Sequence, residues 1–322
     1  MALPVSVGID SESRDGSTTR LEDALERLAE MGYDGVEVPL DGFNAVRNAR
    51  VVPEAVARGR EILGRYPLRY TVHGPNELNL TRDVPRTSEI LESCLEVAAG
   101  LGAEVYVYHS GQIALHDVWI GISPPPTAAA LQDMWARETE ALVPMARRAG
   151  DLGITLVVEN RDPHRWELAA LERWGISAGA LTRYHAGMRL DLVAAQAAQI
   201  DSPHLGVCLD VGHAYLAAPF WPVPDYLAGV RAAAPWVRHV HLHDNYGRLD
   251  DVSTSLADRL MFGEADCHMP PGWGSIPLRE VVRILVGAGY AGWLALEMRE
   301  RYVVYFAEAL ATARKLGRIA EG

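Results

Sequence analysis

Six side chains of the chain could bind a metal ion or move protons, because each is a histidine or a carboxylate at or near the end of a short apolar segment. They are His73, His109, Glu159, Asp210, His241 and Glu297. Imidazole nitrogens and carboxylate oxygens are the ligands that divalent ions take from proteins, and the same groups act as general acids and bases. These residue types therefore indicate metal-assisted or acid–base chemistry.

The apolar segments alternate with helical patterns along the chain. Residues 205–210 form the apolar run typical of a buried parallel strand, whereas Leu21, Ala24, Leu25 and Leu28 recur at helical spacing. We expect strands over residues 5–9, 33–38, 69–73, 104–109, 155–159, 205–210, 237–243 and 293–297. We expect helices over about 18–32, 53–63, 88–101, 128–152, 225–234, 277–288 and 302–316, and helix-like pieces near residues 167–174 and 190–200. This alternation predicts an α/β fold, a closed (β/α)8 TIM barrel that forms a single domain over residues 1–322.

In such a barrel the carboxyl ends of all strands meet at one rim, where the six side chains would converge. Glu159, Asp210 and Glu297 would then be confined together, and carboxylates that lose hydration and repel each other require a cation. No lysine stands at a strand end, so a divalent ion held by nitrogen and oxygen ligands is the simplest cation. The alternative is structural, because a lone strand-end histidine or carboxylate is often a hydrogen-bonded core residue or a helix cap.

Three connections are longer than a barrel requires, over residues 112–127, 161–203 and 244–275. Enlarged loops usually carry function or cover a site. Their tryptophans could stack on sugar or aryl rings, which is compatible with a substrate larger than a monosaccharide, or could pack the loops onto the barrel. The loop tryptophans considered are Trp119, Trp166, Trp174, Trp221 and Trp273.

The charge of the chain disfavours a nucleic-acid partner. It has 42 acidic and 30 basic residues, a formal net charge of −12, and one lysine, Lys315, whereas gripping a phosphate backbone requires basic side chains. Its three scattered cysteines form no Cys-x-x-Cys pair, and no apolar stretch is long enough to cross a membrane. We therefore expect a cytoplasmic protein without a membrane partner.

Seven motifs in order resemble the xylose-isomerase-like barrel superfamily, which includes endonuclease IV and many sugar isomerases and epimerases. The resemblance covers nearly the whole chain. The motifs are Val72-His73-Gly74-Pro75 with Leu78-Asn79-Leu80, Tyr108-His109-Ser110-Gly111, Val158-Glu159-Asn160, Leu209-Asp210-Val211-Gly212-His213, His241-Leu242-His243-Asp244, Asp266-Cys267-His268 with Pro271-Gly272-Trp273-Gly274, and Leu296-Glu297.

The resemblance implies a ligand set. In the sugar branch, Glu159, Asp210, His241 and Glu297 match the residues that bind one divalent ion, most often manganese, and magnesium, cobalt or zinc would also fit. In the endonuclease IV branch three zinc ions are implied. The positions added there are His73, His109, His213, Asp266 and His268. This chain has a suitable residue at all nine positions.

Two classes of function follow from the resemblance. The first is a divalent-metal-dependent sugar isomerase or epimerase, in which Glu159 and Glu297 move a proton beside a chelated carbonyl through an enediolate. The same chemistry can end as a lyase, by β-elimination from a 3-keto-glycoside. The second is a zinc phosphodiesterase acting on abasic DNA, which the charge disfavours. We expect a small carbohydrate substrate. Either a monomer or a homo-oligomer is compatible with the sequence.

Three further residues have weaker assignments. Arg299 could bind a substrate hydroxyl or phosphate, or it could balance the charge of a neighbouring acid such as Glu300. Trp273 could stack on a sugar, or it could pack its loop onto the barrel. Glu37 ends the second predicted strand, where a salt bridge is the simplest interpretation.

Overall fold

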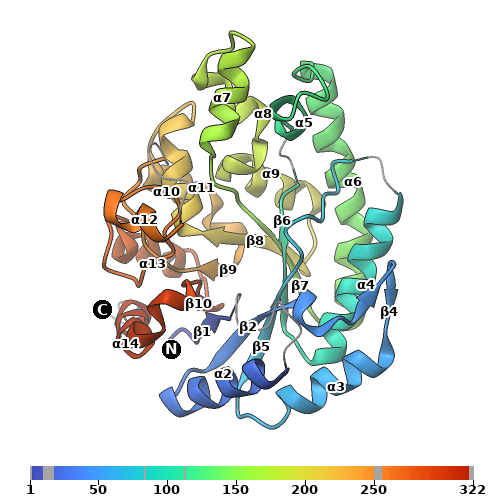
Figure 1. Ribbon diagram of the computed structural model, residues 1–322, viewed down its shortest axis with the longest axis vertical. Helices are drawn as coiled ribbons and strands as arrows, with labels where there is room; N and C mark the ends of the chain where they lie inside the picture. The colour runs from blue at the N-terminus through green and yellow to red at the C-terminus, as the bar shows by residue number, and fades with distance from the viewer. Residues whose placement is uncertain (1, 10–17, 83–84, 112–113, 250–255, 319–322) are drawn as a thin grey trace.

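A closed barrel of eight parallel strands forms the centre of the computed structural model (Figure 1), which describes residues 2–9, 18–82, 85–111, 114–249 and 256–318. The strand order around the barrel is β1-β10-β9-β8-β7-β6-β5-β2. The strands are β1 (Val5–Gly8), β2 (Gly35–Pro39), β5 (Arg69–His73), β6 (Val105–His109), β7 (Thr155–Glu159), β8 (Leu205–Asp210), β9 (Val237–His241) and β10 (Leu294–Leu296). The predicted (β/α)8 fold is confirmed.

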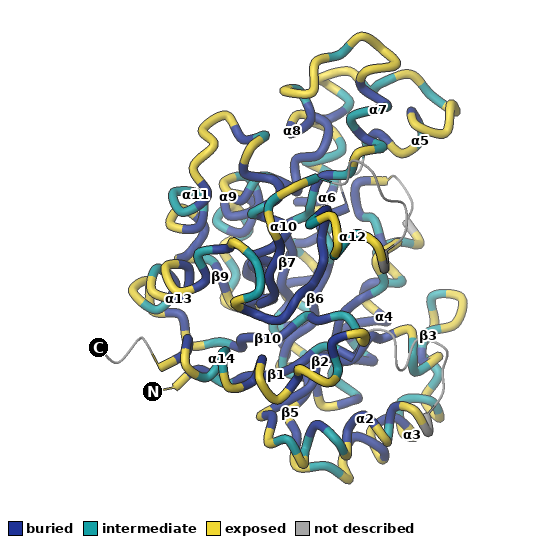
Figure 2. The backbone as a smooth tube through the Cα atoms, turned by 60° about the vertical axis from the view of Figure 1, so that its left-hand side comes forward, coloured by how far each residue is buried: buried dark blue, intermediate teal, exposed yellow. Residues whose placement is uncertain are grey.

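Helices between the strands surround the barrel, and their inward faces are buried (Figures 1 and 2). They are α2 (Thr18–Met31), α3 (Pro53–Leu63), α4 (Pro85–Leu101), α6 (Ala128–Leu152), α9 (Leu190–Ile200), α11 (Tyr226–Ala233), α13 (Leu278–Gly287) and α14 (Phe306–Arg318). Local sequence fixes the ends of α6: the Thr127 side chain accepts a hydrogen bond from the Ala130 amide, and Gly153 ends the helix with a φ of 74°.

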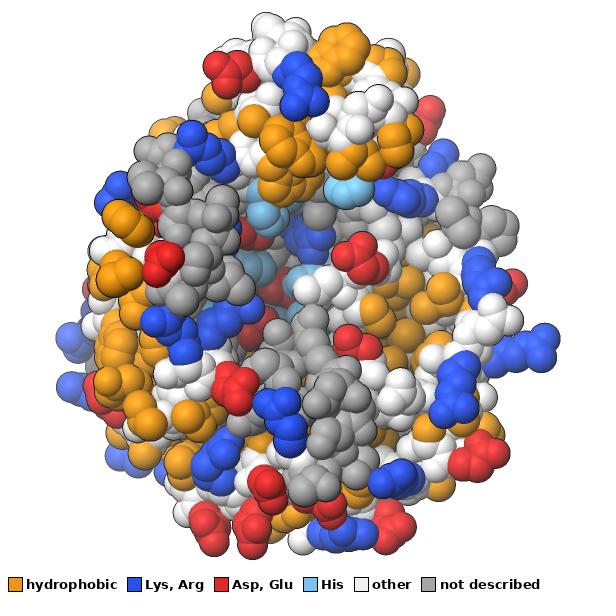
Figure 3. Space-filling model, in the orientation of Figure 1, with side chains coloured by type: hydrophobic (Ala, Val, Ile, Leu, Met, Phe, Trp, Pro, Cys, Tyr) orange, Lys and Arg blue, Asp and Glu red, His pale blue; other side chains and the backbone are white. Residues whose placement is uncertain are grey.

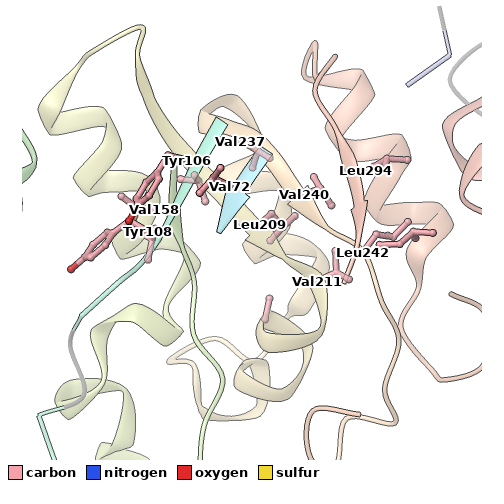
Figure 4. Packing of buried hydrophobic residues seen from close by; sticks show 14 of the residues in the cluster. Val72, Tyr106, Tyr108, Val158, Leu209, Val211, Val237, Val240, Leu242 and Leu294 are labelled. Atoms are coloured by element: carbon pink, nitrogen blue, oxygen red, sulfur yellow. The ribbon is translucent and has the colours of Figure 1, made fainter. Parts of the chain in front are cut away.

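Alternate strand residues face two different environments. Tyr106, Tyr108 and Leu209 point outward into the main core between strands and helices (Figure 4). Val107 and Val157 lie opposite each other where β6 pairs with β7, and both belong to a second, smaller cluster inside the barrel. Since successive side chains of a strand point to opposite faces, the strand-end residues that share the parity of Val107 and Val157 also point inward.

The register brings the strand-end residues to one level. His109 lies opposite Glu159 where β6 pairs with β7, and Asp210 lies opposite His241 where β8 pairs with β9. Pairing of β1 with β10, for example Val7 with Leu296, closes the barrel. The inward side chains of neighbouring strands are therefore held close together by backbone hydrogen bonds.

Several shorter elements were not predicted. They are the hairpin β3 (Val46–Arg47) and β4 (Arg50–Val51), α5 (His116–Trp119), α8 (Leu181–Tyr184), α10 (Val211–Ala217), α12 (Leu256–Phe262), and 3-10 helices at Leu40–Phe43, Ala178–Ala180, Ala186–Met188, Ala218–Phe220, Ala234–Trp236 and Glu300–Tyr305. The helix-like piece expected near residues 167–174 is the helix α7 (Arg165–Arg173). Residues 112–113 and 250–255 of the predicted loops lie outside the described residues.

One predicted boundary was wrong in a way that affects the site. The strand expected over residues 237–243 ends at His241, because Asp244 turns away to pair with Met269 through two backbone hydrogen bonds of 2.9 and 3.1 Å. His243 therefore lies beyond the barrel strand.

Among the described residues, no helix combines the length and apolar character that a membrane crossing needs.

Candidate active site

Four residues from four strand ends meet inside the rim of the barrel, and we call them the donor ring: Glu159, Asp210, His241 and Glu297. One nitrogen or oxygen atom of each lies within 4.8 Å of the others. His241 Nδ1 is 3.0 Å from Glu159 Oε1, 3.2 Å from Glu297 Oε2 and 3.8 Å from Asp210 Oδ2. The structure thus brings together the four residues expected to bind one ion.

Local hydrogen bonds fix Asp210 in the donor ring. The Asp210 carboxylate accepts from the His213 amide at 2.6 Å and so caps α10. The Asn160 side chain accepts from the Asp210 amide at 2.9 Å and donates to the Asp210 carbonyl at 3.0 Å. Asn160, the residue after Glu159, therefore ties the end of β7 to the end of β8.

Glu37 lies beneath the donor ring and contacts it through His241. Glu37 Oε1 is 2.8 Å from His241 Nε2, while Glu37 Oε2 accepts hydrogen bonds of 2.9 Å from His239 and from the Thr71 hydroxyl. A carboxylate beside Nε2 favours a proton there and leaves Nδ1 as the nitrogen facing the ring carboxylates. The salt bridge expected for Glu37 is present, and its partners are imidazoles of the site.

Glu159 is also contacted by two further histidines. His109 Nε2 is 2.7 Å and His73 Nε2 is 3.4 Å from Glu159 Oε2. His73 is held in turn by the Gly74 carbonyl, 2.8 Å from its Nδ1. Glu159 therefore joins the donor ring to the β5–β6 side of the rim.

Asp266 is the centre of a second group beside the ring, which we call the side cluster: His213, His243, Asp266 and His268. Asp266 is 3.4 Å from His213 Nε2 and 3.6 Å from His243 Nδ1, and it contacts His268 Nε2 directly. His243 stacks on His268 with ring centroids 4.3 Å apart. All nine residues with predicted ligand positions are therefore brought together in the donor ring, the side cluster, or contact with Glu159.

His243 was not assigned from the sequence, although it stands in one of the motifs. Its Nε2 lies 3.0 Å from Asp210 Oδ2, so it joins the side cluster to the donor ring. The close packing depends on Gly212, since an added methyl group there would overlap the His243 ring. The only available sequence signal was the alternation of His241 and His243, two residues apart.

Electrostatics keep Glu159 and Glu297 of the donor ring ionised. Burial raises the pKa of Glu159, but His109 and His241 outweigh it and hold that pKa well below its usual range. Burial likewise opposes ionisation of Glu297, and His241 and His268 hold its pKa well below the usual range. Glu159 Oε2, Asp266 Oδ1 and Glu297 Oε2 are buried without a well-aligned hydrogen bond. Such oxygens beside imidazole nitrogens fit a divalent cation.

A cavity of about 830 Å³ opens above the donor ring. Figure 3 shows this hollow, with histidine and acidic side chains at its floor. Glu297, His73, His109, His213, Asp266 and His268 line it, as does Arg299. Trp273 is not among the lining residues; it packs instead against Tyr302 and Tyr305, with ring centroids 5.9 and 4.7 Å away. The position of Trp273 therefore does not support its predicted contact with a sugar.

Comparisons with known proteins agree with this architecture. A family model described as a xylose isomerase-like TIM barrel matches residues 25–319. Fructoselysine 3-epimerase from Escherichia coli O157:H7 is 22% identical over 309 residues, 92% of this chain and 93% of that protein. A D-tagatose 3-epimerase-like protein superimposes with a TM-score of 0.68 at 22% identity, over 100% of both chains. 3-Keto-D-glucoside 4-epimerase from E. coli superimposes with a TM-score of 0.63 at 14% identity, over 97% and 99%.

Proposed function

The chain belongs to the xylose isomerase-like TIM barrel family, and from this premise we propose that it is a divalent-metal-dependent sugar epimerase or isomerase. Its relatives include sugar epimerases. The substrate would be a keto-sugar, and the reaction a proton transfer at the carbon beside the carbonyl through an enediolate. Loss of a group from the next carbon would convert the same chemistry into a lyase reaction.

The observation that carries the proposal is the meeting of two carboxylates from strands that do not pair. Glu159 is the last residue of β7 and Glu297 is the first residue after β10, and each places an oxygen within 3.2 Å of His241 Nδ1. Epimerisation needs a base on one side of a carbon and an acid on the other. Two separately anchored carboxylates can serve these roles.

We assign roles to the residues accordingly. Glu159, Asp210, His241 and Glu297 would hold the ion, and manganese is the ion we propose because the donors are one imidazole and three carboxylates. When bound, it would polarise the substrate carbonyl and hydroxyl oxygens. Glu159 and Glu297 would remove and return the proton.

The residues around the ring would position the substrate. His73, His109, His213 and His268 face the cavity with imidazoles that can hydrogen-bond sugar hydroxyls, and Arg299 can do so from the wall. His213, Asp266 and His268 also form a group of donors that could hold an ion. Because all three line the cavity, we assign them to substrate binding, and the metal count below distinguishes the two roles.

Exchange of the carbon-bound proton with solvent tests the function. The manganese-loaded protein in D2O should introduce deuterium beside the carbonyl of a keto-sugar panel, followed by NMR. Glu159→Gln and Glu297→Gln should lower the rate about 100- to 10,000-fold while retaining the fold, because each removes a proton-transfer group. Glu140→Gln, at an exposed position of α6, is the matched control. Full activity in either ring variant would refute the proton-transfer assignment.

Metal counting tests the number of ions. Elemental analysis of the untagged protein should give about one manganese, cobalt or magnesium per chain, and Asp266→Asn should leave this count unchanged. Two or three zinc ions per chain, reduced by Asp266→Asn, would instead support the phosphodiesterase alternative. Cleavage of abasic-site DNA would then be the next assay, despite the net charge of −12.

A further inference from the structure

The cavity has an aromatic wall that none of the proposed roles uses. It is formed by His116, His164 and Trp166, all of which line the cavity. The Trp166 ring lies 6.2 Å from the His116 ring at 85° and 5.8 Å from the His164 ring at 36°. His116 lies in α5, Trp166 lies in α7, and His164 directly precedes α7. All three therefore belong to the enlarged loops and not to the barrel strands (Figure 1).

Buried polar contacts hold the wall in place. Glu167, with no exposed surface, accepts a hydrogen bond of 2.9 Å from the His164 amide, and its other oxygen is 2.9 Å from His185 Nδ1. Behind the wall, the Trp119 ring lies 6.5 Å from that of Trp166, and Arg173 donates a hydrogen bond to the Trp119 carbonyl. A wall fixed in this way is organised before any ligand binds.

The size of the cavity exceeds what the donor ring requires. Its volume of about 830 Å³ lies towards the upper end of the range for drug-sized ligands, about 300–1,000 Å³. Leu78, Ile90 and Pro163 also line it and add apolar surface. A sugar bound through its oxygens at the ring therefore shares the cavity with an apolar and aromatic region.

Building on the proposed function, we propose that the aromatic wall is a subsite for a second ring carried by the substrate. The keto-sugar would lie at the donor ring, and a substituent on it, either an aryl group or a second sugar, would stack on Trp166. Both substituents present the same chemistry, a flat or weakly polar ring face that packs favourably on an indole. The substrate class is then a glycoside rather than a free monosaccharide.

Binding of non-reacting glucosides tests this subsite. Calorimetry with the manganese-loaded protein would compare p-nitrophenyl β-D-glucoside, cellobiose and methyl β-D-glucoside, which differ only in what the glucose carries. We expect at least one of the two ring-bearing ligands to bind about tenfold or more tightly than the methyl glucoside. The ligand that does so identifies the second ring as aryl or glycosyl.

Trp166→Ala should remove this preference and leave the affinity for the methyl glucoside unchanged. Trp174→Ala is the control, because Trp174 is 51% exposed near the end of α7 and does not line the cavity. Equal binding of all three glucosides by the natural protein would overturn the proposal, as would a preference that survives Trp166→Ala in a variant whose circular dichroism is unchanged.

The test of the subsite and the test of the proposed function can fail independently, because ligand binding does not require turnover. A Trp166-dependent preference in a protein that exchanges no carbon-bound proton would retain the subsite and refute the epimerase. Proton exchange in a free keto-sugar, with no preference for ring-bearing ligands, would retain the epimerase and refute the subsite.

Discussion

His241 is the residue that the rest of the donor ring surrounds, and it is fixed from two sides. Its Nδ1 faces Glu159 and Glu297, and its Nε2 faces Glu37 inside the barrel. Burial raises the pKa of Glu37, but His241 and His239 outweigh it and hold that pKa well below its usual range. The carboxylate that orients the imidazole is therefore ionised.

Replacing Glu37 should weaken ion binding without removing a ligand. Glu37→Gln should lower the affinity for Co2+ about 10- to 100-fold, because the imidazole loses the charge that favours a proton on Nε2. Titration of the visible absorption of Co2+ measures this. Thr71→Val is the control, since it removes only a neutral hydroxyl from the other Glu37 oxygen and should change the affinity less. Equal affinities in the Glu37→Gln and natural proteins would contradict the assignment.

Residue positions at strand ends could be predicted from the sequence, whereas contacts across the barrel could not. His73, His109 and Glu159 were recognised because each closes an apolar run. The contact between Glu37 and His239 joins residues 202 positions apart, and no local pattern reports such a pair. Both packing and sugar stacking were left open for Trp273, because a tryptophan in a loop looks the same in the sequence whether it faces a cavity or packs on tyrosines.

The element that carries the aromatic wall, α7, depends on a charge buried at its first turn. The Glu167 side chain accepts from the His164 amide three residues earlier, which closes the helix end. Burial raises the pKa of Glu167, but His185 and His164 outweigh it and lower that pKa to about 2. The position of α7 is therefore linked to the ionisation of this carboxyl.

Glu167 should make stability depend on acidic pH. Its folded pKa of about 2 lies below the 4.5 that is usual for a glutamate, so its contribution is present above pH 4.5 and is lost as the pH falls towards 2. The natural protein should lose about 3 kcal/mol through this group over that interval. Glu167→Gln should be less stable at pH 7 and should lose less on acidification. Urea unfolding at several pH values measures both, and parallel pH profiles would contradict the prediction.

Elements of ordinary length could be predicted, and the shortest could not. The helices α6 and α9 were expected with the observed bounds, because their apolar periodicity extends over several turns. The hairpin of β3 and β4 and the helix α5 span two to four residues each, too few to show a period. They are set by tertiary contacts, such as that between α5 and α7.

At the scale of the whole molecule, closure joins the first strand of the barrel to the last. The first strand, β1, pairs on one side with β2 and on the other with β10, and α14 packs against both β1 and β10. The alternation of strands and helices predicted this topology, because a sheet of eight parallel strands with helices outside closes on itself.

We therefore expect one unfolding transition for the single domain predicted over residues 1–322. Far-UV circular dichroism should report the helices. The fluorescence of the eight tryptophans, which lie in the loops and their short helices, in α6 and next to β9 and β10, should report tertiary packing. In the metal-free protein the two curves should coincide on heating, as they do for a two-state unit. Two separated transitions would show instead that the enlarged loops or part of the barrel fold independently.

The order of the strands also has a consequence for biosynthesis. Since β10 lies between β1 and β9 and follows every other barrel strand in the chain, both neighbours keep open edges on the ribosome until β10 emerges. Glu297 arrives with that last strand, when Glu159, Asp210 and His241 have already been translated. The nascent chain therefore cannot complete the donor ring before this strand emerges, and an ion held by all four residues would bind only after β10 has been translated.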